Sequence, residues 1–129
     1  MALGRLTIDL DAIAANWRLL ADMAAPSECA AVVKADAYGL GVVPVAQRLA
    51  DAWCRQFFVA TLDEAIELRA ALADITITVL GEPVAGQEAP LLQHRLQPVR
   101  NHPGDLEAWR RWGQGVRVYS STTHKLLSM

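Results

Sequence analysis

The sequence has few of the features that mark exported, metal-binding or membrane proteins. Its 129 residues include only two cysteines, Cys29 and Cys54, which lie far apart and outside any Cys-X-X-Cys motif. This usage predicts buried free thiols in a reducing compartment and argues against a disulfide or a metal site. No run approaches the roughly 20 apolar residues of a membrane span, and the N-terminus has no hydrophobic signal core. We therefore expect a cytoplasmic protein with no membrane partner.

Histidine is scarce and positive charge is not concentrated in any segment. His94, His102 and His124 each lack a second ligand three or four positions away, so we expect no metal site. The net charge is −2 and no basic stripe occurs, which argues against a nucleic-acid partner. Ser120 and Ser121 have no neighbouring base or oxyanion motif, so a hydrolase is not indicated.

Apolar residues make up 53% of the chain and charged residues 20%, a composition typical of a globular domain. Strand-like apolar runs alternate with helical patterns, which predicts βα units around a parallel sheet. We expect strands at residues 6–10, 29–34, 56–60, 75–80, 96–99 and 116–119, with helices at about 13–24, 43–53, 61–73, 87–94 and 106–112. The predicted fold class is α/β, with parallel strands and covering helices. It corresponds to about the first half of a TIM-type (β/α)8 barrel.

The run Val-Val-Lys-Ala-Asp-Ala-Tyr-Gly-Leu-Gly, residues 32–41, places Lys34 directly after a strand. Functional groups of βα proteins gather at the carboxyl ends of strands, and the preceding apolar run favours the neutral, nucleophilic amine. Such an amine forms a Schiff base with a carbonyl, for example that of pyridoxal phosphate. The Tyr38 hydroxyl could donate to a phosphate, while Gly39 and Gly41 permit the positive φ values of an anion loop. The alternative is a lysine that ends a strand by chance, beside a tyrosine that merely packs.

The segment Thr-Leu-Asp-Glu at residues 61–64 has the pattern of a helix capping box. Asp63, Glu64 and Glu67 also place negative charge in the first turns of that helix, where it complements the helix dipole. We therefore expect these carboxylates to have a structural role. Trp109 and Trp112 are expected to pack a later helix.

The decapeptide at residues 32–41 closely resembles the pyridoxal-phosphate attachment motif of alanine racemases. Other segments also resemble that family. Residues 8–13 with Asn16 resemble its opening strand and helix, residues 58–65 with Leu68 and Arg69 resemble its third βα unit, and residues 77–81 resemble its next strand. The resemblance runs from about Arg5 to Val118. It implies that residues 1–118 are the N-terminal part of an alanine racemase barrel domain.

The resemblance also implies roles for a few residues. Lys34 would hold the cofactor, pyridoxal 5′-phosphate, and move the α-proton on one face of the amino acid. Tyr38 would contact the cofactor phosphate, and Val32 and Leu80 would line the cofactor pocket. The implied reaction interconverts L- and D-alanine, for cell-wall precursor supply or for D-alanine catabolism. The implied partner is a small amino acid, and the family is homodimeric.

The resemblance ends near Val118. There the family continues with an aspartate-threonine-glycine-methionine stretch and an arginine, whereas this chain reads Ser-Ser-Thr-Thr-His-Lys at residues 120–125. We therefore expect residues 119–129 to be an aberrant, disordered tail. The C-terminal β domain, which supplies the opposing base from a partner subunit, is expected to be absent. The prediction is a truncated racemase that is inactive alone. The alternative is a non-catalytic fragment of a degenerate or frameshifted gene that at most binds pyridoxal phosphate.

Overall fold

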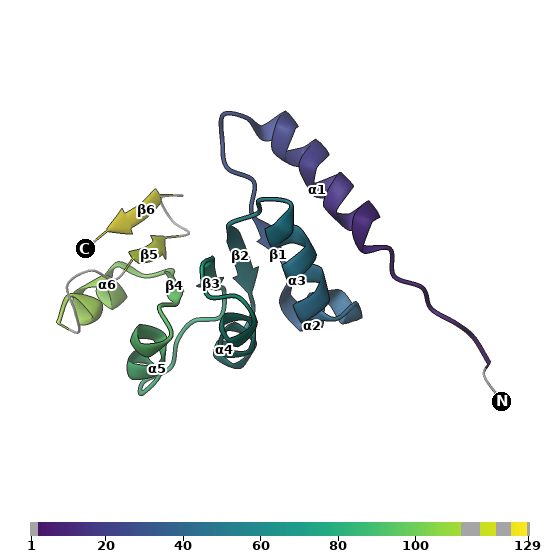
Figure 1. Cartoon of the computed structure of the whole chain (residues 1–129). Helices are drawn as coiled ribbons and strands as arrows, with labels where there is room; N and C mark the ends of the chain where they lie inside the picture. Colours follow the sequence, from purple (N-terminus) through teal and green to yellow (C-terminus); the bar gives the residue numbers. More distant parts are fainter. Residues whose placement is uncertain (1–2, 112–116, 121–124, 129) are drawn as a thin grey trace.

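Helices and strands alternate along the chain in a computed structural model, which describes residues 3–111, 117–120 and 125–128 (Figure 1). The order of elements confirms the predicted alternation. The elements are α1 (Leu10–Ala24), β1 (Ala31–Val32), α2 (Lys34–Gly39), α3 (Val42–Asp51), β2 (Gln56–Val59), α4 (Leu62–Ala71), β3 (Thr76–Val79), α5 (Glu88–Gln93), β4 (Gln97–Arg100), α6 (Pro103–Arg110), β5 (Arg117–Ser120) and β6 (Lys125–Ser128).

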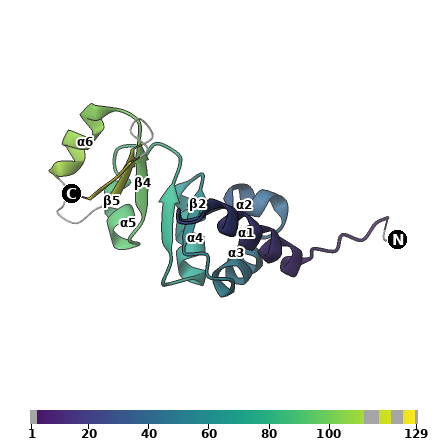
Figure 2. The same ribbon diagram turned by 90° about the horizontal axis from the view of Figure 1, so that it is seen from above.

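The strands form one sheet in the order β1-β2-β3-β4-β5-β6. Each strand from β1 to β4 pairs in parallel with its successor, as expected when a helix returns the chain to the same end of the sheet. Helix α4 packs on β2 and β3, and α3 lies between α4 and α1 (Figure 2). This sequential parallel order confirms the predicted α/β architecture of a partial barrel.

The two faces of the sheet differ in what covers them. Ala31, Phe57 and Ile77 align across three strands and are buried with the helices in the main core. Because side chains alternate along a strand, Val32 belongs to the opposite face, in a row with Phe58. Helix α6 contributes Trp109, which is buried as predicted; Trp112 lies outside the described residues. The helical face therefore contains most of the core.

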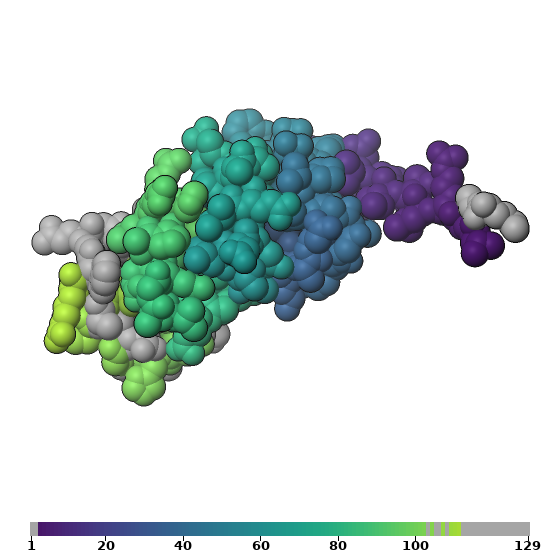
Figure 3. All heavy atoms as spheres, turned by 90° about the horizontal axis from the view of Figure 1, so that it is seen from below, coloured from purple at the N-terminus to yellow at the C-terminus, as the bar shows by residue number. Residues whose placement is uncertain are grey.

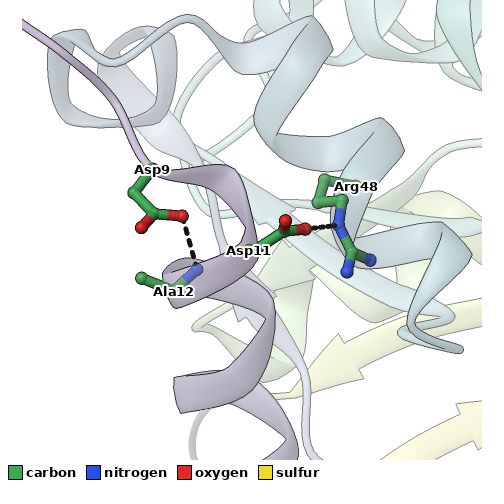
Figure 4. A network of polar contacts seen from close by, with 4 residues as sticks. All are labelled: Asp9, Asp11, Ala12 and Arg48. Atoms are coloured by element: carbon green, nitrogen blue, oxygen red, sulfur yellow. Dashed lines mark hydrogen bonds and ion pairs between the residues drawn. The ribbon is translucent and has the colours of Figure 1, made fainter.

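The N-terminal segment differs from the expected strand at residues 6–10. Within the described part of the chain, residues 3–9 have no ladder partner, and they project away from the body of the molecule (Figure 3). Helix α1 already begins at Leu10, because the Asp9 carboxylate accepts from the Ala12 N–H at 2.9 Å and caps the helix. In the same first turn Asp11 pairs with Arg48 of α3 at 2.8 Å (Figure 4).

The C-terminal residues also differ from the expectation of a tail without regular structure. Residues 125–128 form β6, which pairs antiparallel with β5. An edge strand presents unpaired N–H and C=O groups that a following segment can use whatever its periodicity. The prediction was therefore wrong for these four residues. Residues 121–124 and 129 lie outside the described ranges, and the domain boundary near residue 118 stays a prediction.

Across the described ranges, no helix combines the length and apolar character that crossing a membrane requires. No three histidine, cysteine or acidic side chains in those ranges converge in a way that could hold a metal ion.

Both cysteines are free thiols, as the sequence predicts; Cys29 is half-buried and Cys54 is buried. The Cys54 Sγ donates to the Gln56 carbonyl at 3.4 Å. Burial raises the pKa of Cys54 from 9.0 to about 11. The folded state therefore keeps this proton at pH values at which the unfolded chain has lost it.

This difference makes stability depend on alkaline pH. The contribution of Cys54 is complete below about pH 9 and is lost as the pH rises to about 11, a total of about 3 kcal/mol in the free energy of unfolding. The test is to measure the free energy of unfolding in urea for the wild type and for Cys54→Ala at several pH values between about 9 and 11. We expect the two stability curves to converge with rising pH, and parallel curves would contradict the assignment.

Candidate functional site

Lys34 lies where β1 meets the carboxyl edge of the sheet. The last backbone hydrogen bond between β1 and β2 runs from the Val33 N–H, directly after β1, to the Phe58 carbonyl at 2.9 Å. The Lys34 side chain is half-buried. Within the described residues, the ion pairs do not include Lys34 and no hydrogen bond engages its amine. The amine is therefore open to a ligand.

The segment labelled α2, which begins at Lys34, is a left-handed turn and not a right-handed helix. Ala35, Asp36, Ala37 and Tyr38 have φ values between 52° and 57°, and the turn continues into Gly39 at φ 83°. Each L-residue in this region costs about 1–2 kcal/mol relative to the right-handed helix. The sequence predicts positive φ at the glycines but gives no sign of it at the four preceding residues. Such a turn persists only where neighbouring groups hold it.

Asp36 holds the end of the turn that leads into α3. Its backbone carbonyl accepts from the Gly41 N–H at 2.9 Å, and its side-chain Oδ1 accepts from the Val42 N–H at 2.7 Å. Val42 is the first residue of α3, so this carboxylate satisfies one of the free N–H groups at the helix start. We predicted no such role for Asp36 from the sequence.

Glu64 holds the end of the turn that carries the lysine. Its Oε1 accepts from the Ala35 N–H at 2.8 Å, across 29 residues of sequence. Its Oε2 accepts from Ala60 N at 2.7 Å and Thr61 N at 3.2 Å, while Thr61 Oγ1 accepts from Glu64 N at 3.3 Å. The predicted capping box is confirmed. The bond to Ala35 is an addition that the local pattern does not reveal.

The other predicted site residues lie at the same edge of the sheet. Val32 of β1 is 46% exposed, and Leu80, directly after β3, is 38% exposed; β2 lies between these two strands. The Leu80 N–H donates to the Val59 carbonyl at 2.8 Å, which extends the ladder one step beyond β3. Tyr38, in the left-handed turn, is 63% exposed. No hydrogen bond joins Tyr38 to Lys34, both of which are among the described residues, so the role of Tyr38 stays a prediction.

A hollow at the opposite edge of the sheet does not involve these residues. It is lined by the last turn of α4, which carries Arg69, and by residues at the amino ends of β3 and β4, among them Arg95. Burial lowers the pKa of Arg69, and its guanidinium donates to five backbone carbonyls. Arg69 therefore links the loop after α4 to the loop before β4 and stabilises the edge of the sheet that lies away from Lys34.

Comparison with known proteins identifies the family. A sequence model described as "Alanine racemase, N-terminal domain" matches residues 8–120. The chain belongs to the alanine racemase family. The alanine racemase of Methylobacterium nodulans is 51% identical over 105 residues, which are 81% of this chain and 28% of that protein. The catabolic alanine racemase of Agrobacterium fabrum is 46% identical over 122 residues, 94% of this chain and 31% of that protein.

Solved alanine racemase structures share the fold. The structure from Bartonella henselae, with covalently bound pyridoxal phosphate, has a TM-score of 0.77 and 42% identity. It is matched over 81% of this chain and 30% of its own length. The biosynthetic enzyme from Pseudomonas aeruginosa has a TM-score of 0.78 and 35% identity, over 92% of this chain and 35% of its own. The chain thus spans about a third of the length of these relatives or less.

The two glycines that close the turn differ in their surroundings, which predicts unequal effects of adding a methyl group. At Gly41, with φ 95°, a Cβ would lie 3.3 Å from Pro44 Cγ; at Gly39, with φ 83°, it would meet nothing within 4 Å. Gly41→Ala should lower the free energy of unfolding by about 2 kcal/mol and Gly39→Ala by about 1 kcal/mol. Urea unfolding of the two variants and the wild type, compared where their m-values agree, measures these losses. Equal losses would show that the contact with Pro44 is unimportant.

Proposed function

We propose that this chain is the cofactor-binding part of an alanine racemase and that Lys34 is the attachment point of pyridoxal 5′-phosphate. The observation that carries the proposal is the position of Lys34. Its amine lies free of protein partners in the described part of the chain, at the carboxyl edge of a parallel sheet. Functional groups of βα folds gather at this edge. The family supports alanine as the substrate.

The residues around Lys34 fit this cofactor. A neutral lysine amine bonds to an aldehyde carbon with loss of one water molecule. Val32 and Leu80 leave apolar surface exposed at the same edge, where an aromatic ring could cover it. The exposed Tyr38 hydroxyl is free to donate to a phosphate. When bound, the cofactor supplies an electron sink that stabilises negative charge at the substrate α-carbon.

The chain's own contribution to proton transfer is the Lys34 Nζ. As a neutral amine this atom accepts the α-proton from one face of the substrate, and as an ammonium group it returns a proton to that face. Racemisation also needs a group that serves the other face. The residues assigned above provide acid–base chemistry on one face only. This favours a second candidate function, in which the 129-residue chain binds the cofactor without racemising alanine.

Covalent labelling tests the attachment, because the sequence has only two lysines, Lys34 and Lys125. We expect pyridoxal 5′-phosphate and borohydride to modify Lys34 at least about ten-fold faster than Lys125, as read by peptide mass mapping; this ratio corresponds to about 1.4 kcal/mol. Lys34→Ala should remove the fast label, and the matched control Lys125→Ala should retain it. Equal labelling of both lysines would reject the proposal.

Production of D-alanine then separates the two candidate functions. Fast labelling of Lys34 together with D-alanine formation from L-alanine supports a racemase. Fast labelling without D-alanine supports a cofactor-binding chain.

A further inference from the structure

The pairing of β1 with β2 stops just before the lysine. The paired residues are Ala31 with Phe57 and Val32 with Phe58, and one more bond joins the Val33 N–H to the Phe58 carbonyl. Rungs of a parallel ladder are evenly spaced, so the next donor on this side would be the Ala35 N–H. The left-handed turn takes Ala35 out of the ladder. The backbone at Lys34 therefore needs another anchor.

The Glu64 carboxylate occupies the position of the missing rung. The carbonyl of Ala60, two residues beyond Phe58, instead accepts from the Gly81 N–H of the neighbouring strand region at 2.9 Å. Glu64 Oε1 receives the Ala35 N–H at 2.8 Å, and Oε2 receives the Ala60 N–H at 2.7 Å. One half-buried carboxylate thus bridges the ends of β1 and β2 with short, charge-assisted bonds.

We propose that Glu64 is a positioning residue for Lys34: its carboxylate replaces the end of the β1–β2 ladder and fixes the peptide that follows the lysine. The inference rests on the proposed function of Lys34. Glu64 acts through the backbone, because the ion pairs of the described residues include none between Glu64 and Lys34. The other end of the turn depends on Asp36, so loss of the Glu64 bond frees the lysine end alone.

The positioning role can be separated from the capping role of the same residue. A capping box requires a side-chain oxygen on the N-cap N–H, and Oε2 supplies it at Thr61. The bond from Oε1 to Ala35 adds nothing to the cap of α4. Thr61→Ala removes the hydroxyl that accepts from Glu64 N and leaves the carboxylate in place, so it weakens the cap only. Glu64→Gln retains one acceptor oxygen for three N–H donors, so it weakens both roles.

The experiment compares the wild-type chain, Glu64→Gln and the matched control Thr61→Ala. Amide hydrogen exchange at Ala35 measures how firmly the hydrogen bond from the Ala35 N–H to the Glu64 carboxylate is held. The ratio of Lys34 to Lys125 modification by pyridoxal 5′-phosphate and borohydride measures the position of the amine. For Glu64→Gln we expect about ten-fold faster exchange at Ala35 and a ratio about ten-fold lower, the size of one charge-assisted bond. For Thr61→Ala we expect both readouts to stay within about two-fold of the wild type.

Four results would overturn the inference. Equal changes in the two variants would make Glu64 a cap and nothing more. If Glu64→Gln exchanges faster at Ala35 but keeps the wild-type ratio of Lys34 to Lys125 modification, the hydrogen bond between Glu64 and Ala35 does not position the lysine. A wild-type ratio near one would reject the proposed function of Lys34 itself, and the inference with it. A high wild-type ratio that Glu64→Gln retains rejects the Glu64 inference alone.

Discussion

The left-handed turn after Lys34 is the constraint on which the site depends. Four consecutive L-residues with φ near 55° carry a cost of about 4–8 kcal/mol together, so the turn exists only because its surroundings hold it. Two carboxylates do so from opposite ends, Glu64 at Ala35 and Asp36 at Val42. The strain ends the β1 ladder abruptly and leaves the lysine amine at the open edge of the sheet.

The fold places both ends of this turn on rigid elements. Glu64 lies in the first turn of α4, and α4 packs on β2 and β3. Val42 begins α3, whose buried face continues the same core and whose Arg48 pairs with α1. Strain stored at a functional site is offset by the packing around it. In this protein the helical face supplies that packing, and the opposite face carries the exposed Val32 and Leu80.

The sequence predicts the parts that depend on local pattern. The β-branched run at residues 75–80 and the capping box at residues 61–64 were both identified, because period and cap chemistry are written in neighbouring residues. The failures have separate physical causes. β6 forms because β5 offers an edge, and α1 begins early because of the Asp9 cap. The bond from Ala35 to Glu64 spans 29 residues, so no local spacing reveals it. The attachment of cofactor to Lys34 rests on the family motif rather than on any periodicity.

The most direct test of the account is a crystal structure of the chain after treatment with pyridoxal 5′-phosphate and borohydride. We predict continuous density from the Lys34 Nζ to the pyridoxyl group, with residues 35–38 still left-handed and the Glu64 carboxylate accepting from the Ala35 N–H. Density on Lys125 instead, or a right-handed turn after Lys34, would contradict it.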